Sequence, residues 1–256
     1  RLKEWLFPPA RDVALEPPPG IQPAEGWVIQ RYVERPLLLE GRKFDMRAYC
    51  LVARTTPGHL WYFAPGYCKV AMEIFSLEEL DNHFRHLTNA CVQRAHPECR
   101  EARRGQHIWS EAEAGHWLRE AGKISGDVGE FWARVHNDMK LALSWLFEAS
   151  KGGLERKEGY FDLWGVDFML DEDLNLHLLE VNSNPALFFE CSPTLRALVP
   201  KVIGESLDLV LQAVKPLDKG EPCSTPSDTS LFTCIVDEAA GFVYTDESSA
   251  FDAMRN

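Results

Sequence analysis

The chain has 256 residues, of which 45% are hydrophobic, so it can bury a substantial core as one large domain or one and a half. Its formal net charge of −12 argues against nucleic acid as a partner, because phosphate binding needs a basic face. No run approaches the roughly 18 to 20 uncharged apolar residues of a membrane span, so we expect a soluble, cytosolic protein that does not bind membranes.

Prolines dominate the first 25 residues and bias the backbone towards extended conformations, which indicates a linker or a truncated edge. From Gly26 the pattern changes to β structure. We expect strands over 27–33 and 47–54, followed by a turn at 55–58 into a third strand over 59–64. These predict a β-meander at the start of a domain that spans residues 26–215.

Ser76, followed three residues later by Glu79, forms a capping-box pattern that predicts a short helix over 77–84. Residues 92–130 are rich in charge and broken by glycines, so we interpret them as a variable, mobile insertion and assign no site residues to them. A clear helix is expected around 135–147, because Val135, Met139 and Leu143 recur every four residues.

Strands over 163–170 and 176–181 are predicted to flank a polar turn, and a final helix is expected over 200–214. Together these elements indicate an α/β chain, or an α+β chain with a mixed sheet. Residues 216–256 hold eight acids and two bases, a net charge of −6. Their only apolar run, 231–236, allows either a short docking strand or disorder, and we favour disorder.

The seven cysteines are odd in number and include no CxxC pair. This favours reduced thiols in a reducing compartment over a disulfide framework or a zinc site.

The hairpin over 163–181 carries the most informative chemistry. If residues 172–175 form its loop, Asp171 pairs with Leu176 and Asp167 lies opposite Glu180. Period-two alternation then places Asn182 on the same face. Two facing carboxylates in an apolar hairpin repel each other unless a cation lies between them, and oxygen-only ligands favour Mg²⁺. The alternative is a solvated strand face with ordinary surface acids.

A second polar set lies on the strand that begins near Arg42. Asp45 and Arg47 share one face, where an arginine can bind two phosphate oxygens and an aspartate can accept from a ribose hydroxyl. A surface ion pair between them explains the same pattern. Thr88 and Asn89 form a third polar spot, which a turn or a helix cap also explains.

Four stretches in order make the chain resemble the tubulin tyrosine ligase-like proteins, which are ATP-grasp ligases that modify tubulin tails. The stretches are WVIQRYVERPLLLEGRKFDMRAY (27–49), HLTN (86–89), IWS (108–110) and GYFDLWGVDFMLDEDLNLHLLEVNSNPAL (159–187). Several long motifs in the same order are more specific than any short pattern. The resemblance runs from about residue 27 to 214 and implies the C-terminal part of an ATP-grasp fold.

The resemblance also implies roles for individual residues. Those expected to bind ATP are Gln30, Arg31, Tyr32, Val33, Lys43, Phe44, Asp45, Thr88 and Asn89. The expected Mg²⁺ ligands are Asp167, Glu180 and Asn182. Arg47 matches an arginine at the reacting groups. Lys69 falls where most members have an arginine that binds the carboxylate of the incoming amino acid, and lysine keeps the charge but loses the bidentate fork.

The family mechanism joins a free amino acid to a protein carboxylate through an acyl phosphate. Similarity to the polyglycylase branch implies glycine as the amino acid, tubulin tails as the acidic partner, and microtubules or the ciliary axoneme as the location. A polyglutamylase is the main alternative. The family's upstream nucleotide lysines and glycine-rich loop have no counterpart here, so the chain is expected to carry half of an active site. A non-catalytic tubulin-binding or partner-binding module is therefore also open.

Overall fold

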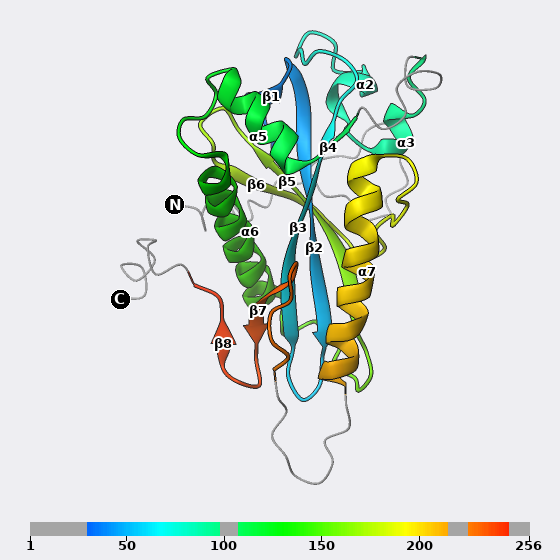
Figure 1. Ribbon diagram of the computed structural model, residues 1–256, viewed down its shortest axis with the longest axis vertical. Helices are drawn as coiled ribbons and strands as arrows, with labels where there is room; N and C mark the ends of the chain where they lie inside the picture. Colours follow the sequence, from blue (N-terminus) through cyan, green and yellow to red (C-terminus); the bar gives the residue numbers. More distant parts are fainter. Residues whose placement is uncertain (1–29, 98–106, 215–224, 246–256) are drawn as a thin grey trace, which may run out of the picture.

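The computed structural model describes residues 30–97, 107–214 and 225–245. Within them, one antiparallel sheet has the strand order β6-β5-β2-β3-β7-β8, with β1 beside β2 and β4 beside β3 (Figure 1). The strands are β1 Leu38–Leu39, β2 Arg42–Arg54, β3 Leu60–Val70, β4 Ile108–Trp109, β5 Asp162–Leu170, β6 Leu176–Asn182, β7 Thr233–Asp237 and β8 Phe242–Val243. The helices are α2 His83–His86, α3 Ala90–Gln93, α5 Glu111–Glu120, α6 Val128–Ser150 and α7 Pro193–Ala213. The expected combination of helices and a sheet is confirmed, but the expected mixed sheet is wrong, because the strand pairs of the described residues are antiparallel.

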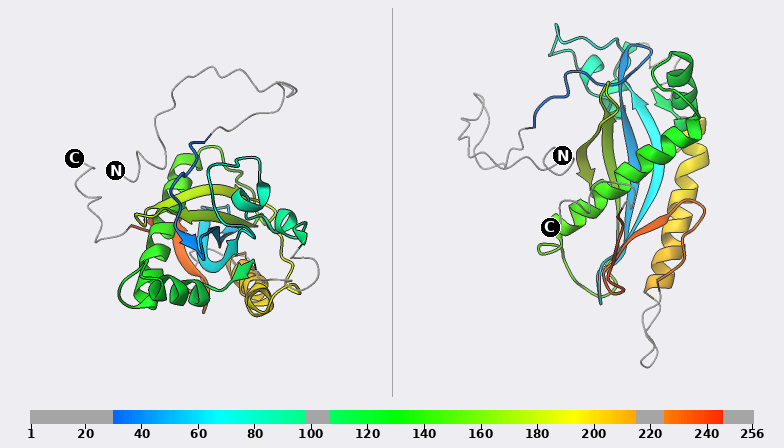
Figure 2. Two further views of the ribbon diagram at one scale, coloured as in Figure 1. Left: turned by 90° about the horizontal axis from the view of Figure 1, so that it is seen from above. Right: turned by 90° about the vertical axis from the view of Figure 1, so that its left-hand side faces the viewer.

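Strand β2 runs through the middle of the sheet and is buried on both faces, so it divides the core in two. One core packs against α5 and α6, and the other packs against α7 (Figure 2). Successive β2 side chains alternate between them, as strand geometry requires. Those facing α6 include Met46, Ala48, Cys50 and Val52, and those facing α7 include Tyr49, Leu51 and Ala53. None of the helices in the described ranges is long and apolar enough to cross a membrane.

The predicted helix around 135–147 is confirmed as part of α6, which the side chain of Asp127 caps by accepting from the Glu130 backbone N–H. The expected mobile insertion over 92–130 is wrong for its described part from residue 107 onward. Ser110 and Glu113 form a reciprocal capping box that begins α5, and Ala114 and Leu118 bury its inner face. Residues 98–106 lie outside the described residues.

Two other helix boundaries differ from the expectation. Helix α7 begins at Pro193 rather than Pro200, with Ser192 as its cap, and continues through Pro200. Leu195 and Val199 are buried against the sheet, so packing outweighs the local cost of the internal proline. The helix predicted over 77–84 is only the single turn of α2, because Asn82 rather than Ser76 provides the cap.

Two expectations at the ends of the described chain also fail. Residues 30–33 form no strand, and the expected strand's first residues, 27–29, lie outside the described part, as does the proline-rich segment over 1–25. At the other end, the disorder favoured for 216–256 is wrong for residues 225–245. Strand β7 pairs with β3, and Phe232, Ile235 and Val236 are fully buried. Short apolar β-formers next to an open sheet edge can complete the sheet by pairing.

Candidate functional site

The candidate site is built on β2, where Lys43, Asp45 and Arg47 alternate with core residues and share the α7 side of the sheet. All three are buried, with exposed fractions of 7%, 7% and 9%. Phe44, which was expected beside the nucleotide, points the other way into the α6 core and is fully buried. Strand alternation explains this correction, since neighbouring residues cannot share a face.

Arg47, Asp167 and Lys69 form a buried ionic cluster across three neighbouring strands. Arg47 donates from Nε and Nη2 to the two carboxylate oxygens of Asp167, at 2.6 and 3.0 Å. Lys69 on β3 donates from Nζ to Asp167 Oδ2 at 2.8 Å. Burial by itself would raise the pKa of Asp167, but the hydrogen bond and charge of Arg47 and the charge of Lys69 outweigh it and lower that pKa.

The hairpin register confirms that Asp167 pairs with Glu180, although two local features differ from the prediction. Leu170, rather than Asp171, pairs with Leu176, so the loop is one residue longer than expected. A bulge between the Asp167 and Phe168 pairs then inserts one extra residue on β6, Leu179. The two one-residue shifts cancel, and the Asp167–Glu180 pair remains.

Glu180 and Asn182 both lie on β6, the edge strand next to the strand that carries Asp167. Asn182 Nδ2 donates to Glu180 Oε1 at 3.0 Å, and Asn182 pairs with Gly165 of β5. The repulsion expected between Asp167 and Glu180 is already relieved by two protein cations, Arg47 and Lys69. An ionised carboxylate accepts about four hydrogen bonds, and described residues donate three to Asp167, of which only one goes to Oδ1, so Oδ1 keeps capacity for one more partner. The oxygen donors therefore fit Mg²⁺.

Asp45 has one satisfied and one unsatisfied oxygen. Thr88 donates its hydroxyl to Oδ2, whereas Oδ1 is buried without a hydrogen-bond partner among the described residues. Burial raises the pKa of Asp45, and the charges of Lys69 and Lys43 offset only part of that effect. A buried acceptor without a donor is costly, and a ligand hydroxyl would satisfy it. Asn89, the other polar residue of this spot, is exposed at the start of α3 and caps no helix with its side chain.

Tyr32, His86 and Lys43 connect the expected adenine segment with the ionic cluster. Lys43 Nζ donates to the His86 carbonyl at 2.7 Å and lies 5.3 Å from the centre of the Tyr32 ring. The Tyr32 hydroxyl bonds His86 Nδ1 at 2.8 Å, and His86 Nε2 lies 3.0 Å from the Glu79 carbonyl. A carbonyl can only accept, so Nε2 carries a proton, and in the neutral ring Nδ1 then accepts from Tyr32. Burial lowers the pKa of Lys43.

The other residues of the segment 30–33 are less closely connected to the site than Tyr32. Gln30 donates from Nε2 to the Leu179 carbonyl at 3.3 Å, which ties the segment to β6. Arg31 is exposed and Val33 is half-buried. The structure therefore brings Tyr32 to Lys43 and His86 and connects Gln30 to β6, and it gives no contact within the described ranges that links Arg31 or Val33 to the cluster.

A glycine creates the space in which the Arg47 guanidinium lies. A Cβ atom built on Gly165 would come within 2.8 Å of both Arg47 Nη1 and Pro185 Cβ. Such an approach is too close, so only glycine leaves this space open. The sequence offered no signal for this role, because the contact depends on the pairing of β5 with β2.

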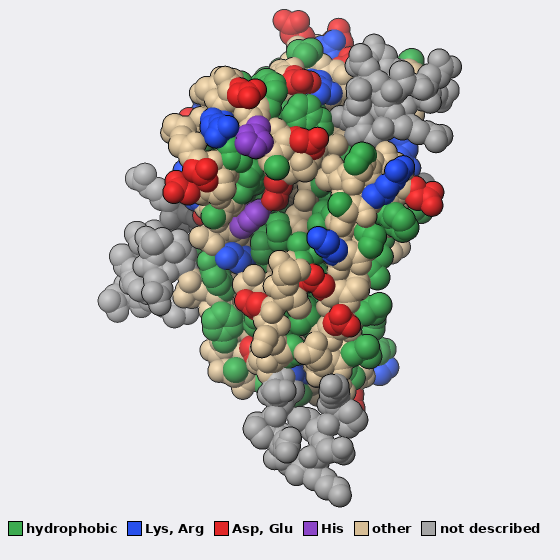
Figure 3. All heavy atoms as spheres, in the orientation of Figure 1, with side chains coloured by type: hydrophobic (Ala, Val, Ile, Leu, Met, Phe, Trp, Pro, Cys, Tyr) green, Lys and Arg blue, Asp and Glu red, His purple; other side chains and the backbone are tan. Residues whose placement is uncertain are grey.

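The buried cluster holds three cations, Lys43, Arg47 and Lys69, against two carboxylates, Asp45 and Asp167. This excess of positive charge contrasts with the acidic chain as a whole, and Figure 3 shows acidic and basic side chains interspersed on one outer face. Fixed donors in a water-poor place suit a phosphate group better than any neutral ligand.

Two of the cysteines in the described ranges lie on the opposite face of the sheet from this cluster. Cys50 and Cys68 are buried in the α6 core, where burial raises the pKa of both thiols. Among the residues that the structure describes, no three His, Cys, Asp or Glu side chains gather closely enough to hold a metal ion by themselves.

Comparison of the sequence with known proteins places the chain in a family. Residues 13–221 match the tubulin-tyrosine ligase family. The chain is 35% identical over 196 residues to protein polyglycylase TTLL10 of Macaca fascicularis, and 34% identical over 196 residues to inactive polyglycylase TTLL10 of Homo sapiens. It is 31% identical over 171 residues to probable tubulin polyglutamylase TTLL9 of Mus musculus. These alignments cover 76%, 76% and 64% of this chain, but only 31%, 28% and 34% of the respective relatives.

Proposed function

Because the chain belongs to the tubulin-tyrosine ligase family, we propose that it carries the ATP- and Mg²⁺-binding part of a ligase that joins an amino acid to a protein carboxylate. The observation that carries the proposal is the buried cluster of Lys43, Arg47 and Lys69 around Asp45 and Asp167. It supplies more positive than negative charge at one point of an acidic chain.

In this proposal, Mg²⁺ would be held by Asp167, Glu180 and Asn182. When bound, the ion neutralises phosphate charge and fixes the orientation of the triphosphate. Lys43 would contact the phosphates, and the open oxygen of Asp45 would accept from a ribose hydroxyl. Arg47 would stabilise the charge that spreads over the transferring phosphoryl group, with Asp167 holding its guanidinium in place.

The proposed reaction has two steps. An oxygen of the acceptor carboxylate attacks the γ-phosphorus of ATP, ADP leaves, and an acyl phosphate forms. The amine of the free amino acid then attacks the acyl carbon, inorganic phosphate leaves, and the nitrogen loses a proton. Lys69 would attract the carboxylate of that amino acid, since Asp167 uses one of the three donors of its ammonium group.

Glycine is our proposed amino acid and tubulin tails our proposed acceptor, with microtubules or a ciliary axoneme as the place of action. Support comes from the similarity to protein polyglycylase TTLL10 of Macaca fascicularis. Two alternatives rest on specific relatives. Similarity to probable tubulin polyglutamylase TTLL9 favours glutamate, and similarity to inactive polyglycylase TTLL10 of Homo sapiens favours a binding module without catalysis.

Mass spectrometry of tubulin tails separates these three outcomes. The chain is incubated with tubulin, MgATP and a mixture of glycine and glutamate, and Arg47→Gln serves as the matched control. The proposal predicts mass increments of one or more glycine residues that disappear in Arg47→Gln. Glutamate increments would establish the first alternative. Unmodified tails, together with retention of tubulin on the immobilised chain, would establish the second.

A further inference from the structure

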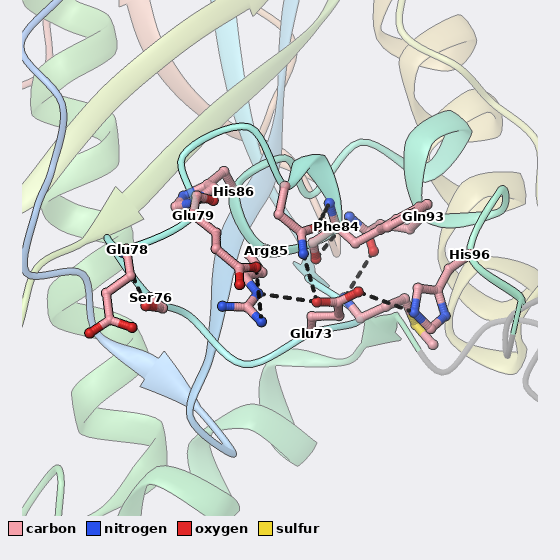
Figure 4. Close-up of polar contacts among 11 residues, drawn as sticks. Glu73, Ser76, Glu78, Glu79, Phe84, Arg85, His86, Gln93 and His96 are labelled. Atoms are coloured by element: carbon pink, nitrogen blue, oxygen red, sulfur yellow. Dashed lines mark hydrogen bonds and ion pairs between the residues drawn. The ribbon is translucent and has the colours of Figure 1, made fainter.

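Three side chains near the candidate site join the segment after β3 to α2 and α3, and we call them the brace: Glu73, Arg85 and Gln93. Figure 4 shows them pointing towards one another from three separate parts of the chain. None of them is among the residues of the candidate site. Their contacts connect the segment after β3 to the backbone beside the carbonyl that accepts from Lys43.

Gln93 is the most deeply buried member of the brace, with an exposed fraction of 0%. Its Oε1 accepts from the Met72 backbone N–H at 2.8 Å. Its Nε2 donates to the Leu87 carbonyl and, at 3.5 Å, to the Phe84 carbonyl. One amide group therefore holds three backbone points that lie apart in sequence. A buried amide with both ends used in this way fixes a backbone position rather than merely filling space.

Glu73 and Arg85 complete the brace from the other side. Glu73 Oε2 accepts from Arg85 Nε at 3.1 Å and from Asn82 Nδ2 at 2.9 Å (Figure 4). The backbone N–H of Glu73 donates to the Phe84 carbonyl at 3.3 Å. These bonds hold the single turn of α2, which is too short to be stable by itself.

The brace ends at the residues that form the site. Leu87, whose carbonyl Gln93 holds, stands between His86 and Thr88. The His86 carbonyl accepts from Lys43, and the Thr88 hydroxyl donates to Asp45. A shift of Leu87 would therefore move the acceptor of Lys43 and the donor of Asp45 together.

We infer that Gln93 is a positioning residue: its amide sets the backbone of His86 to Thr88 and thereby fixes the ammonium group of Lys43 for a nucleotide phosphate. The assignment of phosphate to Lys43 rests on the proposed function, whereas the mechanical link from Gln93 to Lys43 rests on the contacts alone. The two parts therefore need separate measurements.

The link is tested by the acetylation rate of Lys43 with acetic anhydride, followed by peptide mass spectrometry, in the whole chain without nucleotide. Gln93→Met keeps the size of the side chain but removes all three hydrogen bonds. We expect Lys43 to react about tenfold faster in this variant. The net free energy of roughly one hydrogen bond changes the fraction of molecules in which Lys43 is released from the His86 carbonyl by about that factor. Exposed Lys201 reports the intrinsic rate and should not change.

A second variant covers the case in which Gln93→Met does not fold. Gln93→Glu keeps the acceptor for Met72 and removes both donations to the loop, so Lys43 should again react faster. Cys91→Ser, at an exposed position of α3, is the matched control and should behave as wild type. Equal Lys43 rates in wild type and in a folded Gln93 variant would overturn the inference.

Titration of MgATP into the same proteins tests the second part. We expect affinity to fall about tenfold in the Gln93 variants and to stay unchanged in Cys91→Ser. If the wild type binds no MgATP but Lys43 still reacts faster in the variants, the proposed function fails and the link from Gln93 to Lys43 stands. If MgATP binds equally well to wild type and variants although Lys43 reacts faster, the positioning of Lys43 for phosphate is overturned.

Discussion

Strand β2 carries two buried arginines, Arg47 and Arg54, each paired with an aspartate, yet their surroundings differ in one respect. Arg54 Nη2 lies 3.6 Å from Asp237 Oδ1 on β7, and both side chains are 4% exposed. Arg47 pairs with Asp167, but Lys69 binds the same carboxylate, and Lys43 lies four residues before Arg47 on the same face of β2. The pair at Arg54 is balanced, whereas the cluster at Arg47 has surplus positive charge.

This difference separates a structural ion pair from a candidate binding site. A buried charge must be compensated, and at Arg54 one carboxylate is sufficient. The aspartate there also accepts from Thr225 and from the Ala240 backbone N–H, so it organises the segment that adds β7 to the sheet. At Arg47 the surplus charge favours a further anion, which none of the buried side chains in the described part of the chain supplies. Four expected outcomes test the comparison.

The largest effect is expected at the structural pair. Asp237→Ala leaves Arg54 buried without its carboxylate and should lower the free energy of unfolding by about 3–5 kcal/mol. Urea denaturation measures it. Inorganic triphosphate should not restore the free energy of unfolding of this variant, because the Arg54 pair has no surplus cation that would bind an anion. A change below about 1 kcal/mol would show that water or rearrangement compensates Arg54.

A slightly smaller and reversible effect is expected at the candidate site. Asp167→Asn removes the shared partner of Arg47 and Lys69 and should cost about 3 kcal/mol. Here inorganic triphosphate should restore stability, by about 2.7 kcal/mol at a hundred times its dissociation constant. Thermal unfolding with and without triphosphate checks this. Equal responses of Asp167→Asn and Asp237→Ala would remove the distinction between the two regions.

His107, which directly precedes β4, should account for part of the stability that the protein loses in acid. His107 is 1% exposed, and burial together with the charge of Arg94 lowers its pKa to about 4. The unfolded chain binds this proton near pH 6.5, so the stabilising contribution is complete above that pH and is lost as pH falls from 6.5 towards 4. The loss should be about 3 kcal/mol, because each pH unit between 6.5 and about 4 corresponds to roughly 1.4 kcal/mol. His107→Gln should flatten this part of the stability profile, whereas exposed His116→Gln should not.

The smallest effect concerns the space for Arg47. Gly165→Ala places a Cβ atom 2.8 Å from Arg47 Nη1 and should cost about 1–3 kcal/mol through overpacking. Gly204→Ala is the control, because no atom lies within 4 Å of its added Cβ, and within α7 it should stabilise by about 0.5–1 kcal/mol. Thermal unfolding compares the two. Two stabilised variants would show that Arg47 moves aside without cost.

The sequence predicted the combination of helices and sheet and the central part of α6, because hydrophobic periodicity determines both. The Asp167–Glu180 pair was predicted from a loop one residue too short, and it remains only because the bulge on β6 offsets that error. The sequence could not predict that Lys69 binds Asp167 or that Gly165 makes room for Arg47, since both contacts depend on β2 pairing with strands far away in sequence. It also placed Phe44 in the site and favoured disorder for β7. The first error ignored strand alternation, and the second arose because burial of β7 needs the edge of β3.

Isothermal titration of MgATP into the whole chain tests the central claim most directly, with and without excess EDTA. We predict that wild type binds ATP more tightly with Mg²⁺ and that Glu180→Gln loses this dependence on the metal while its thermal unfolding is unchanged. Asp173→Asn, at the turn of the same hairpin, should respond as wild type does. The absence of binding by wild type, or the same metal dependence in Glu180→Gln, would contradict a magnesium-nucleotide site on this hairpin.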